Sequence, residues 1–111
     1  MPVIKPTWRT RQRYILFEAE CEAPVYEADV KNAAYAAMLS FLGEYGWSLA
    51  NPKLMRYDAA KKAGIMRCEH RETEKVKAAL ALCTSINGKK AALRLRKTSG
   101  TIAGLRRRAV R

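Results

Sequence analysis

An apolar stripe in the first half of the chain is the feature that most constrains the fold. From Val30 to Tyr45, apolar residues recur at steps of three and four residues, which is the spacing of one face of an α-helix. Asp29 precedes this stripe as a candidate N-cap, and Gly46 follows it where a C-cap glycine belongs. A helix with one apolar face must bury that face against another element, so the rest of the chain has to supply one.

Segments that alternate apolar and polar residues supply the expected strands. The first, at 13–21, is apolar on both faces early on, because Tyr14 and Leu16 lie opposite Ile15 and Phe17. A strand covered on both faces is typical of the centre of a sheet. Further strands are predicted at 53–57, 65–71 and 91–96, with a hairpin loop at 59–64.

A second helix is predicted to open at Glu72 or Thr73. Its apolar face consists of Val76, Ala79, Leu80 and Cys83. The dipeptide Asn87-Gly88 then predicts a tight turn before the last strand. That strand places Ala91, Leu93 and Leu95 on one face and Arg94 and Arg96 on the other.

The order is therefore strand, helix, strand, strand, helix, strand, with a short basic helix appended. This order predicts an α+β fold of the ferredoxin-like (RRM-like) split β-α-β type, in which two helices cover one face of a four-stranded antiparallel sheet. Right-handed crossovers place the first and third strands in the middle. Ile102 and Leu105 of the C-terminal helix are expected to cover Tyr14 and Leu16.

A chain of 111 residues has the length of one domain. We expect residues 1–13 to form a basic arm without regular structure. Residues 14–108 form the single domain, C-terminal helix included, and residues 109–111 are a frayed end.

The basic charge is concentrated at the two ends of the chain. Four basic residues and no acid lie in 1–13, nine basic residues and no acid follow Gly88, and 14–88 holds nine basic residues against all ten acids. Two acid-free segments attract phosphate backbones, so the charge favours a nucleic-acid partner. The sequence has neither an apolar run of about 18 residues nor an apolar signal core. We therefore expect a cytoplasmic protein.

The stretch Thr98-Ser99-Gly100-Thr101-Ile102 leads from the last strand into the basic helix. Its amides and hydroxyls are suited to hold a phosphate oxygen, and simple capping of the helix by Ser99 or Thr98 is a compatible alternative. Basic residues at both ends complete the predicted RNA-binding set: Arg9, Arg11, Arg13, Lys89, Lys90, Arg94, Arg96, Lys97, Ser99, Gly100, Thr101, Arg106, Arg107 and Arg108.

No base-stacking platform is predicted. An RNA recognition motif needs aromatic residues on the first and third strands, and the third strand, at 64–70, has none. Tyr35 and Tyr45 are candidates for base stacking, but their place in an apolar stripe favours a core position.

No catalytic residue, metal ligand or bound cofactor is predicted either. The three cysteines are widely spaced, which argues against a disulfide framework and a zinc ribbon. Cys68 and His70 share a face of the predicted third strand, where a buried thiol beside a half-exposed histidine is the simpler interpretation. His70 has no placed catalytic partner. Nearby glutamates surround a helix start and complement its dipole: Glu69, Glu72 and Glu74.

Five short segments resemble the ribonuclease P protein component 2 family, the archaeal counterpart of a subunit shared by eukaryotic ribonuclease P and its mitochondrial RNA processing relative. They are Arg13-Tyr14-Ile15-Leu16-Phe17-Glu18, Gly64-Ile65-Met66-Arg67-Cys68, Val76-Lys77-Ala78-Ala79-Leu80, Ile86-Asn87-Gly88 and Thr98-Ser99-Gly100-Thr101-Ile102. The resemblance spans about residues 6–108. It departs from the family's pattern at the short, alanine-rich segment 23–32 and at Ala103-Gly104, which weakens the last helix.

The resemblance implies a ferredoxin-like protein cofactor of a ribozyme. In that family the RNA, with its magnesium, cleaves the 5′ leader from precursor tRNA, and the protein is a non-catalytic subunit that binds no cofactor of its own. Its expected partners are the ribonuclease P RNA, ribonuclease P protein component 3 as direct protein partner, other ribonuclease P proteins and, indirectly, precursor tRNA. An apolar surface around Trp47, Leu49 and Leu54 is a candidate for the protein contact.

Two alternatives remain open at this point. A small ribosomal protein has a similar charge distribution, and reconstituted cleavage of precursor tRNA separates the two. A small hydrolase using His70 belongs to another class, and replacement of His70 by alanine tests it.

Overall fold

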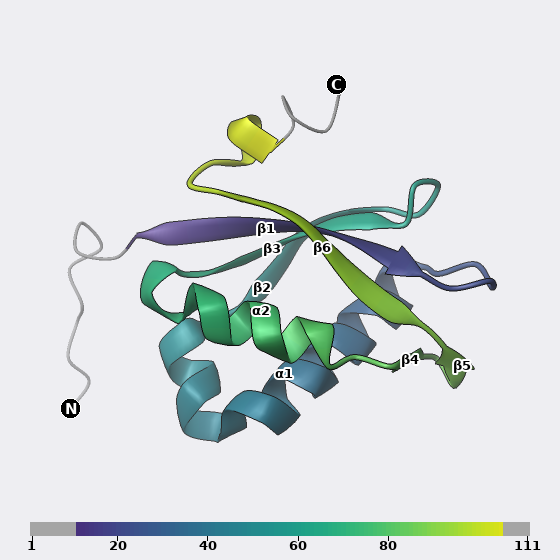
Figure 1. Cartoon of the computed structure of the whole chain (residues 1–111), viewed down its shortest axis with the longest axis horizontal. Coiled ribbons are helices and arrows are strands. Elements are labelled where there is room, and N and C mark those ends of the chain that lie inside the picture. The colour runs from purple at the N-terminus through teal and green to yellow at the C-terminus, as the bar shows by residue number, and fades with distance from the viewer. Residues whose placement is uncertain (1–10, 106–111) are drawn as a thin grey trace.

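The computed structural model describes residues 11–105 and shows an α+β fold with a four-stranded antiparallel sheet, as predicted (Figure 1). In chain order the elements are β1 (Gln12–Glu20), α1 (Glu27–Ala50), β2 (Lys53–Asp58), β3 (Ala63–Glu69), the 3-10 turn η2 (His70–Glu72), α2 (Thr73–Ala81), β4 (Ser85–Ile86), β5 (Lys89–Lys90) and β6 (Ala92–Ser99). Residues 102–105 form one further helical turn. Within the described residues, no helix is long and apolar enough to span a membrane.

The strand order in the sheet is β2-β3-β1-β6, so the first and third strands are central, as predicted. Both helices lie on one face of the sheet, which we call the inner face, and the turn at 102–105 lies on the opposite, outer face (Figure 1). The short strands β4 and β5 form a separate hairpin. Its turn residues, Asn87 (φ 53°) and Gly88 (φ 79°), are both left-handed, as a two-residue hairpin turn requires, and this confirms the turn.

The hydrophobic core fills the space between the inner face and the two helices. β1 contributes Ile15 and Phe17, which are fully buried. The apolar face predicted for the second helix is buried as well, with Val76, Ala79 and Leu80 on α2 and Cys83 just beyond the end of α2 at Ala81. Gly64 lies directly opposite Phe17 on β3, and a Cβ atom there would come within 2.7 Å of the phenyl Cζ. The ring of Phe17 therefore occupies the space that a side chain at 64 would need.

Helix α1 is longer than predicted, and both predicted caps are wrong. Tyr26 is the N-cap, and Asp29 lies inside the first turn, where its carboxylate accepts a 3.3 Å hydrogen bond from the Tyr26 amide. Gly46 does not end the helix. The backbone leaves the helical conformation at Gly43 (φ 75°, ψ 175°) and then resumes it to Ala50. Asn51, with a left-handed φ of 45°, provides the C-cap.

The outer face carries a small apolar cluster of its own. Leu105 is fully buried there, although it lies outside the main core. Leu16 and Leu105 line the same groove, as expected from the apolar second face of β1. Ile102 stays partly exposed. The remainder of the predicted C-terminal helix, through 108, lies outside the described residues, as do 1–10 and the predicted frayed end.

The predicted arm and the first strand meet slightly earlier than expected. β1 begins at Gln12, and the carbonyl of Arg11 accepts a 2.9 Å hydrogen bond from the His70 amide. Gln12 and Arg13 therefore belong to the central strand β1, where they pair with β3, and Arg11 is joined to the same end of the sheet by the bond from His70.

Candidate nucleic-acid interface

Two of the predicted RNA-binding arginines are already paired with acids from the neighbouring strand. Arg94 Nε donates a 2.5 Å hydrogen bond to Glu20 Oε2, and Arg96 Nη2 donates a 2.8 Å hydrogen bond to Glu18 Oε1. The antiparallel pairing of β1 and β6 places Glu18 beside Arg94. The segment after Gly88 contains no acid, but the fold places two carboxylates of β1 against its arginines.

The pair of Arg94 and Glu20 shifts the pKa of both of its members. The hydrogen bond from Arg94 holds the pKa of Glu20 below its usual value, and the same bond raises the pKa of Arg94. Both side chains are exposed, so water and salt screen the pair and it contributes little to stability. A phosphate can therefore displace the carboxylate at small cost.

The predicted lysines are available to solvent. Lys89 and Lys90 are exposed on the β4–β5 hairpin, and Lys97 is partly exposed on β6. Within residues 11–105, none of the three takes part in an ion pair. Arg11 is exposed next to β1. Four other predicted residues lie outside the described part of the chain: Arg9, Arg106, Arg107 and Arg108.

Arg13 does not project freely from the molecule. It is partly buried opposite Cys68, its Nη1 donates a 3.2 Å hydrogen bond to the Gln12 carbonyl, and the same atom lies 3.4 Å from where a Cβ of Gly100 would be. Arg13 thus packs close to the turn that begins at Ser99.

The hydroxyls of the Ser-Gly-Thr segment serve as local caps. Thr101 Oγ1 accepts a 3.0 Å hydrogen bond from the Gly104 amide, and Ser99 Oγ accepts a 3.2 Å bond from the Thr101 amide. The capping residue of the turn is therefore Thr101, and the prediction of Ser99 or Thr98 in that role is wrong. Position 104 favours glycine, because a Cβ atom there would lie 2.5 Å from Ser99 Oγ.

Three basic residues on the outer face were missed by the sequence analysis. The strand register places Lys53 of β2 beside Arg67 of β3, and Arg67 beside Tyr14 of β1. The neighbouring row across the sheet runs from β2 to β6 through Arg56, Ile65, Leu16 and Lys97. Residues directly opposite each other share a face, so Lys53, Arg56 and Arg67 lie on the outer face. Their alternation with inward residues was a usable signal, but bulges on β2 and β6 shift the register.

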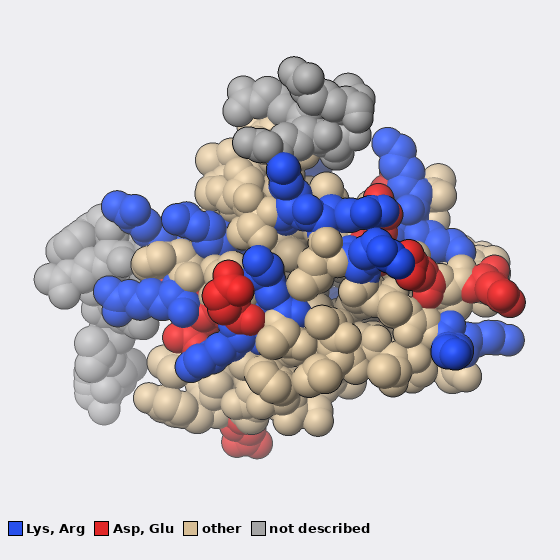
Figure 2. Space-filling model, viewed as in Figure 1, with Lys and Arg blue, Asp and Glu red and all other residues tan. Residues whose placement is uncertain are grey.

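The charge pattern is visible on the surface. Figure 2 shows basic side chains gathered over the sheet and both flanks, with a few acids among them, whereas the lower region over α1 is largely uncharged. Helix α1 also carries exposed apolar side chains: Leu39, Phe41, Tyr45 and Leu49. Tyr45 is 79% exposed, so its predicted core position is wrong, whereas Tyr35 packs edge-on against Trp47 beside the core.

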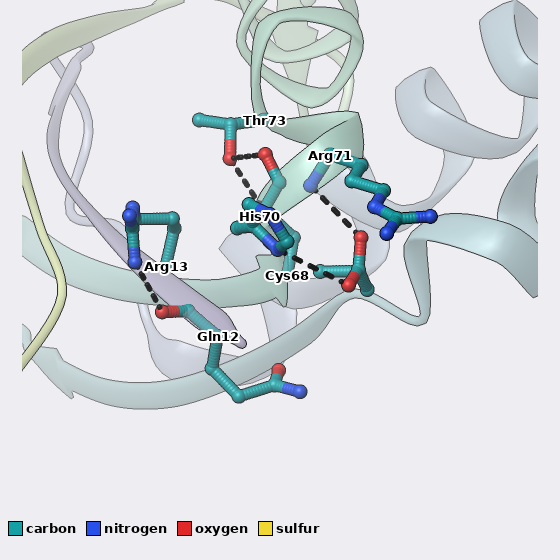
Figure 3. Close-up of polar contacts among 7 residues, drawn as sticks. Gln12, Arg13, Cys68, His70, Arg71 and Thr73 are labelled. Carbon is teal, nitrogen blue, oxygen red and sulfur yellow. Dashed lines mark hydrogen bonds and ion pairs between the residues drawn. The ribbon is translucent and has the colours of Figure 1, made fainter. Parts of the chain in front are cut away.

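Cys68 and His70 do not form a shared site. β3 ends at Glu69 and His70 opens the turn η2, so the prediction of a strand through 71 is wrong there. Cys68 is fully buried, burial raises the pKa of its thiol, and its Sγ lies 3.9 Å from Thr73 Oγ1. His70 Nδ1 lies 3.3 Å from Glu69 Oε2 (Figure 3). A buried, protonated thiol is a poor nucleophile and metal ligand. Cys68 therefore adds neither a nucleophile nor a metal ligand to His70.

Comparisons with known proteins point to one family. The model of the Rpp14/Pop5 family matches residues 13–110. Ribonuclease P protein component 2 of Pyrococcus abyssi is 37% identical over 108 residues, covering 97% of this chain and 92% of the relative. The protein of the same name from Thermococcus gammatolerans is 40% identical over 105 residues, covering 95% and 88%.

A solved structure supports the fold. A chain in the cryo-EM structure of yeast Ribonuclease MRP superposes with a TM-score of 0.56 at 10% identity, covering 82% of this chain and 75% of the yeast chain. At that identity, the likeness concerns the course of the backbone.

Proposed function

The chain belongs to the Rpp14/Pop5 family, and we propose that, as a protein subunit of ribonuclease P, it supports the catalytic RNA by contacts between basic side chains and phosphates. Ribonuclease P is the ribonucleoprotein that removes the 5′ leader from precursor tRNA. The named relatives, at 37% and 40% identity over nearly the whole chain, support the subunit role. The phosphate contacts rest on the geometry of this chain.

The observation that carries the proposal is the charge of the outer sheet face. Basic side chains from three strands lie on it: Lys53, Arg56, Arg67, Arg94 and Lys97. Among residues 11–105, both long helices lie on the inner face and only the turn at 102–105 lies on this one (Figure 1). A surface of this kind neutralises RNA phosphates and releases their counterions, which drives binding without base recognition. Arg94 and Arg96 become available to phosphates when these replace the carboxylates of Glu20 and Glu18.

Neutralisation of phosphates explains how a protein without a catalytic constellation assists cleavage. Folded RNA brings phosphates close together, and their repulsion opposes the compact state that holds catalytic metal ions. Bound cationic side chains reduce that repulsion. We therefore infer that the subunit lowers the magnesium concentration that the RNA needs, and that the magnesium is held by the RNA.

The partner protein is expected on another surface. We propose ribonuclease P protein component 3 as a direct partner and other ribonuclease P proteins as further neighbours in the particle. Exposed apolar side chains on α1, among them Phe41 and Leu49, are of the kind that partner proteins cover. The predicted contact around Trp47 and Leu54 is partly used internally, because both pack against the core.

We further propose the ferredoxin-like split β-α-β arrangement with a C-terminal helix that continues past Leu105, and a cytoplasmic location. The element order and the central position of β1 and β3 support the first part. The location remains a prediction.

The test is reconstituted cleavage of precursor tRNA together with the salt dependence of RNA binding. The variant Lys53→Gln/Arg67→Gln/Lys97→Gln removes three outer-face charges. The slope of the logarithm of RNA affinity against the logarithm of salt concentration should become shallower by about 2 to 3 in this variant, since each neutralised phosphate contributes roughly 0.7 to 0.9. The variant should also need more magnesium for the same cleavage rate.

The control Lys31→Gln/Lys75→Gln/Lys77→Gln removes the same charge from the two helices. It should keep the wild-type slope and magnesium requirement. Equal slopes for both triple variants would contradict the proposal, as would cleavage by the purified protein without RNA.

A further inference from the structure

A groove crosses the outer face between the turn at 102–105 and the β2–β3 hairpin. Both of these segments rise from the same side of the sheet, opposite the helices (Figure 1). The groove has a volume of about 740 Å³, within the usual range for a small-molecule or nucleotide site. Six of its residues carry the argument: Leu16, Ile65, Leu105, Arg56, Asp58 and Lys61.

The floor of the groove is apolar and rigid. Leu16 and Ile65 are direct neighbours on the two central strands, and Leu105 packs at one side without any exposed surface. Backbone hydrogen bonds on both sides hold the central strands in place. Apolar side chains of this kind pack against the flat face of a nucleobase, and every base has such a face.

The rim of the groove is cationic. Arg56 and Lys61 are exposed, and neither forms an ion pair with another residue in 11–105. Asp58 is the acid at this rim, but its Oδ1 accepts hydrogen bonds of 3.0 and 3.4 Å from the amides of Ala60 and Lys61. The carboxylate is thus engaged with the loop, while the two cations remain available to a phosphate.

We propose that this groove binds one unpaired nucleotide of RNA, with the base on the floor of Leu16 and Ile65, beside Leu105, and the phosphate held by Arg56 and Lys61. The inference rests on the proposed function, because it assumes that RNA approaches the outer face. The cationic rim favours a nucleotide over an apolar peptide side chain, which gains nothing from Arg56 or Lys61. The site adds base contact to a surface otherwise suited only to phosphates.

The experiment measures the affinity of the full-length chain for three RNA probes. They are a short single-stranded oligonucleotide, the same oligonucleotide with abasic positions, and a blunt duplex of matched length. Ala63, on β3 at the groove wall, is replaced by Phe to fill the groove. Ala63→Phe should weaken binding of the single strand by about tenfold, the size of one base contact. It should leave abasic and duplex binding unchanged.

A second variant tests the rim without touching a packed residue. Arg56→Gln/Lys61→Gln should weaken binding of the single strand. It should also make the salt dependence of that binding shallower by the contribution of about one phosphate contact, roughly 0.7. The charge-matched control Lys75→Gln/Lys77→Gln should do neither. Urea unfolding of each variant identifies any loss of fold, and the rim variant still decides the question if Ala63→Phe does not fold.

Distinct results separate failure of the inference from failure of the proposed function. Equal loss for base-containing and abasic probes would overturn the base site, and wild-type binding by both groove variants would overturn the whole groove. Loss of binding to component 3 alone, with RNA affinity intact, would assign the groove to a protein and overturn the inference too. If wild-type protein fails to stimulate cleavage, the proposed function itself is wrong.

Discussion

Arg94 on β6 and Glu20 on β1 are 74 residues apart in the sequence, and their Nε and Oε2 atoms lie 2.5 Å apart in the fold. Arg96 and Glu18 repeat the arrangement nearby on the same pair of strands. The basic C-terminal stretch is therefore partly neutralised by the first strand. RNA binding by these arginines is an exchange of partners, in which two carboxylates yield to phosphates.

Removal of both carboxylates should strengthen RNA binding. In Glu18→Gln/Glu20→Gln, Arg94 and Arg96 no longer have to leave an acid, and two negative charges near the RNA are lost. Exposed pairs of this kind are weak, so the affinity should rise by several-fold at low salt and by less at high salt. Filter binding or fluorescence anisotropy with ribonuclease P RNA measures the change.

The matched control for this double substitution is Glu27→Gln/Glu44→Gln, which removes two acids from exposed positions of α1. Its effect on affinity should be much smaller, because the helices lie on the other face of the sheet. An equal gain in both variants would mean that net charge alone decides affinity.

Titration of Glu20 should reveal the ion pair directly. The hydrogen bond from Arg94 holds the pKa of Glu20 below 4.5, so the folded state binds this proton less readily than the unfolded state does. Its contribution to stability is therefore present above about pH 4.5 and is lost as the pH falls through the lowered pKa. NMR titration of the side-chain carboxyl should show the low value in wild type and its return toward 4.5 in Arg94→Gln. An unchanged Glu20 pKa in that variant would remove Arg94 as the cause.

Local patterns predicted the elements whose signals lie within a few residues. The face of α2 with Val76, Ala79 and Leu80 and the turn at Asn87-Gly88 were confirmed, because periodicity and turn chemistry are local. The central position of β1 also followed from its two apolar faces. The end of α1 was missed, because Gly43, Gly46 and Asn51 all resemble stop signals, and only packing decides among them.

The candidate interface was less predictable, because it depends on which strands are neighbours. Nothing local to Arg94 indicates Glu20, and nothing local to Lys53 indicates that it lies beside Arg67. Each bulge shifts a strand by one residue, which moves the following side chains to the other face. The sequence alone therefore identifies the basic segments. The charged surface that they form can be identified only when the register of the strands is known.

The three cysteines should differ sharply in reactivity. Burial raises the pKa of Cys68 and of Cys83, whereas Cys21 is only partly buried. Since the thiolate is the reactive form, one thiol should react quickly with a chromogenic disulfide at about pH 8 and two slowly. Cys21→Ser should abolish the fast phase, and urea should make the remaining thiols react together. A fast phase that persists in Cys21→Ser would place another cysteine at the surface.

The contact between Gly64 and Phe17 should make position 64 intolerant of any side chain. A Cβ there would lie 2.7 Å from the Phe17 ring and 3.2 Å from the Arg56 carbonyl oxygen, so Gly64→Ala should lower the free energy of unfolding by about 1 to 3 kcal/mol. Gly100→Ala is the control, because its nearest neighbour is the Arg13 guanidinium at 3.4 Å. Urea denaturation measures both.

In a double-mutant cycle, Phe17→Leu should cost less in the Gly64→Ala background than alone, since the shorter side chain relieves the clash. If the two losses are additive, the Phe17 ring is not what excludes a side chain at position 64, and the Arg56 carbonyl is.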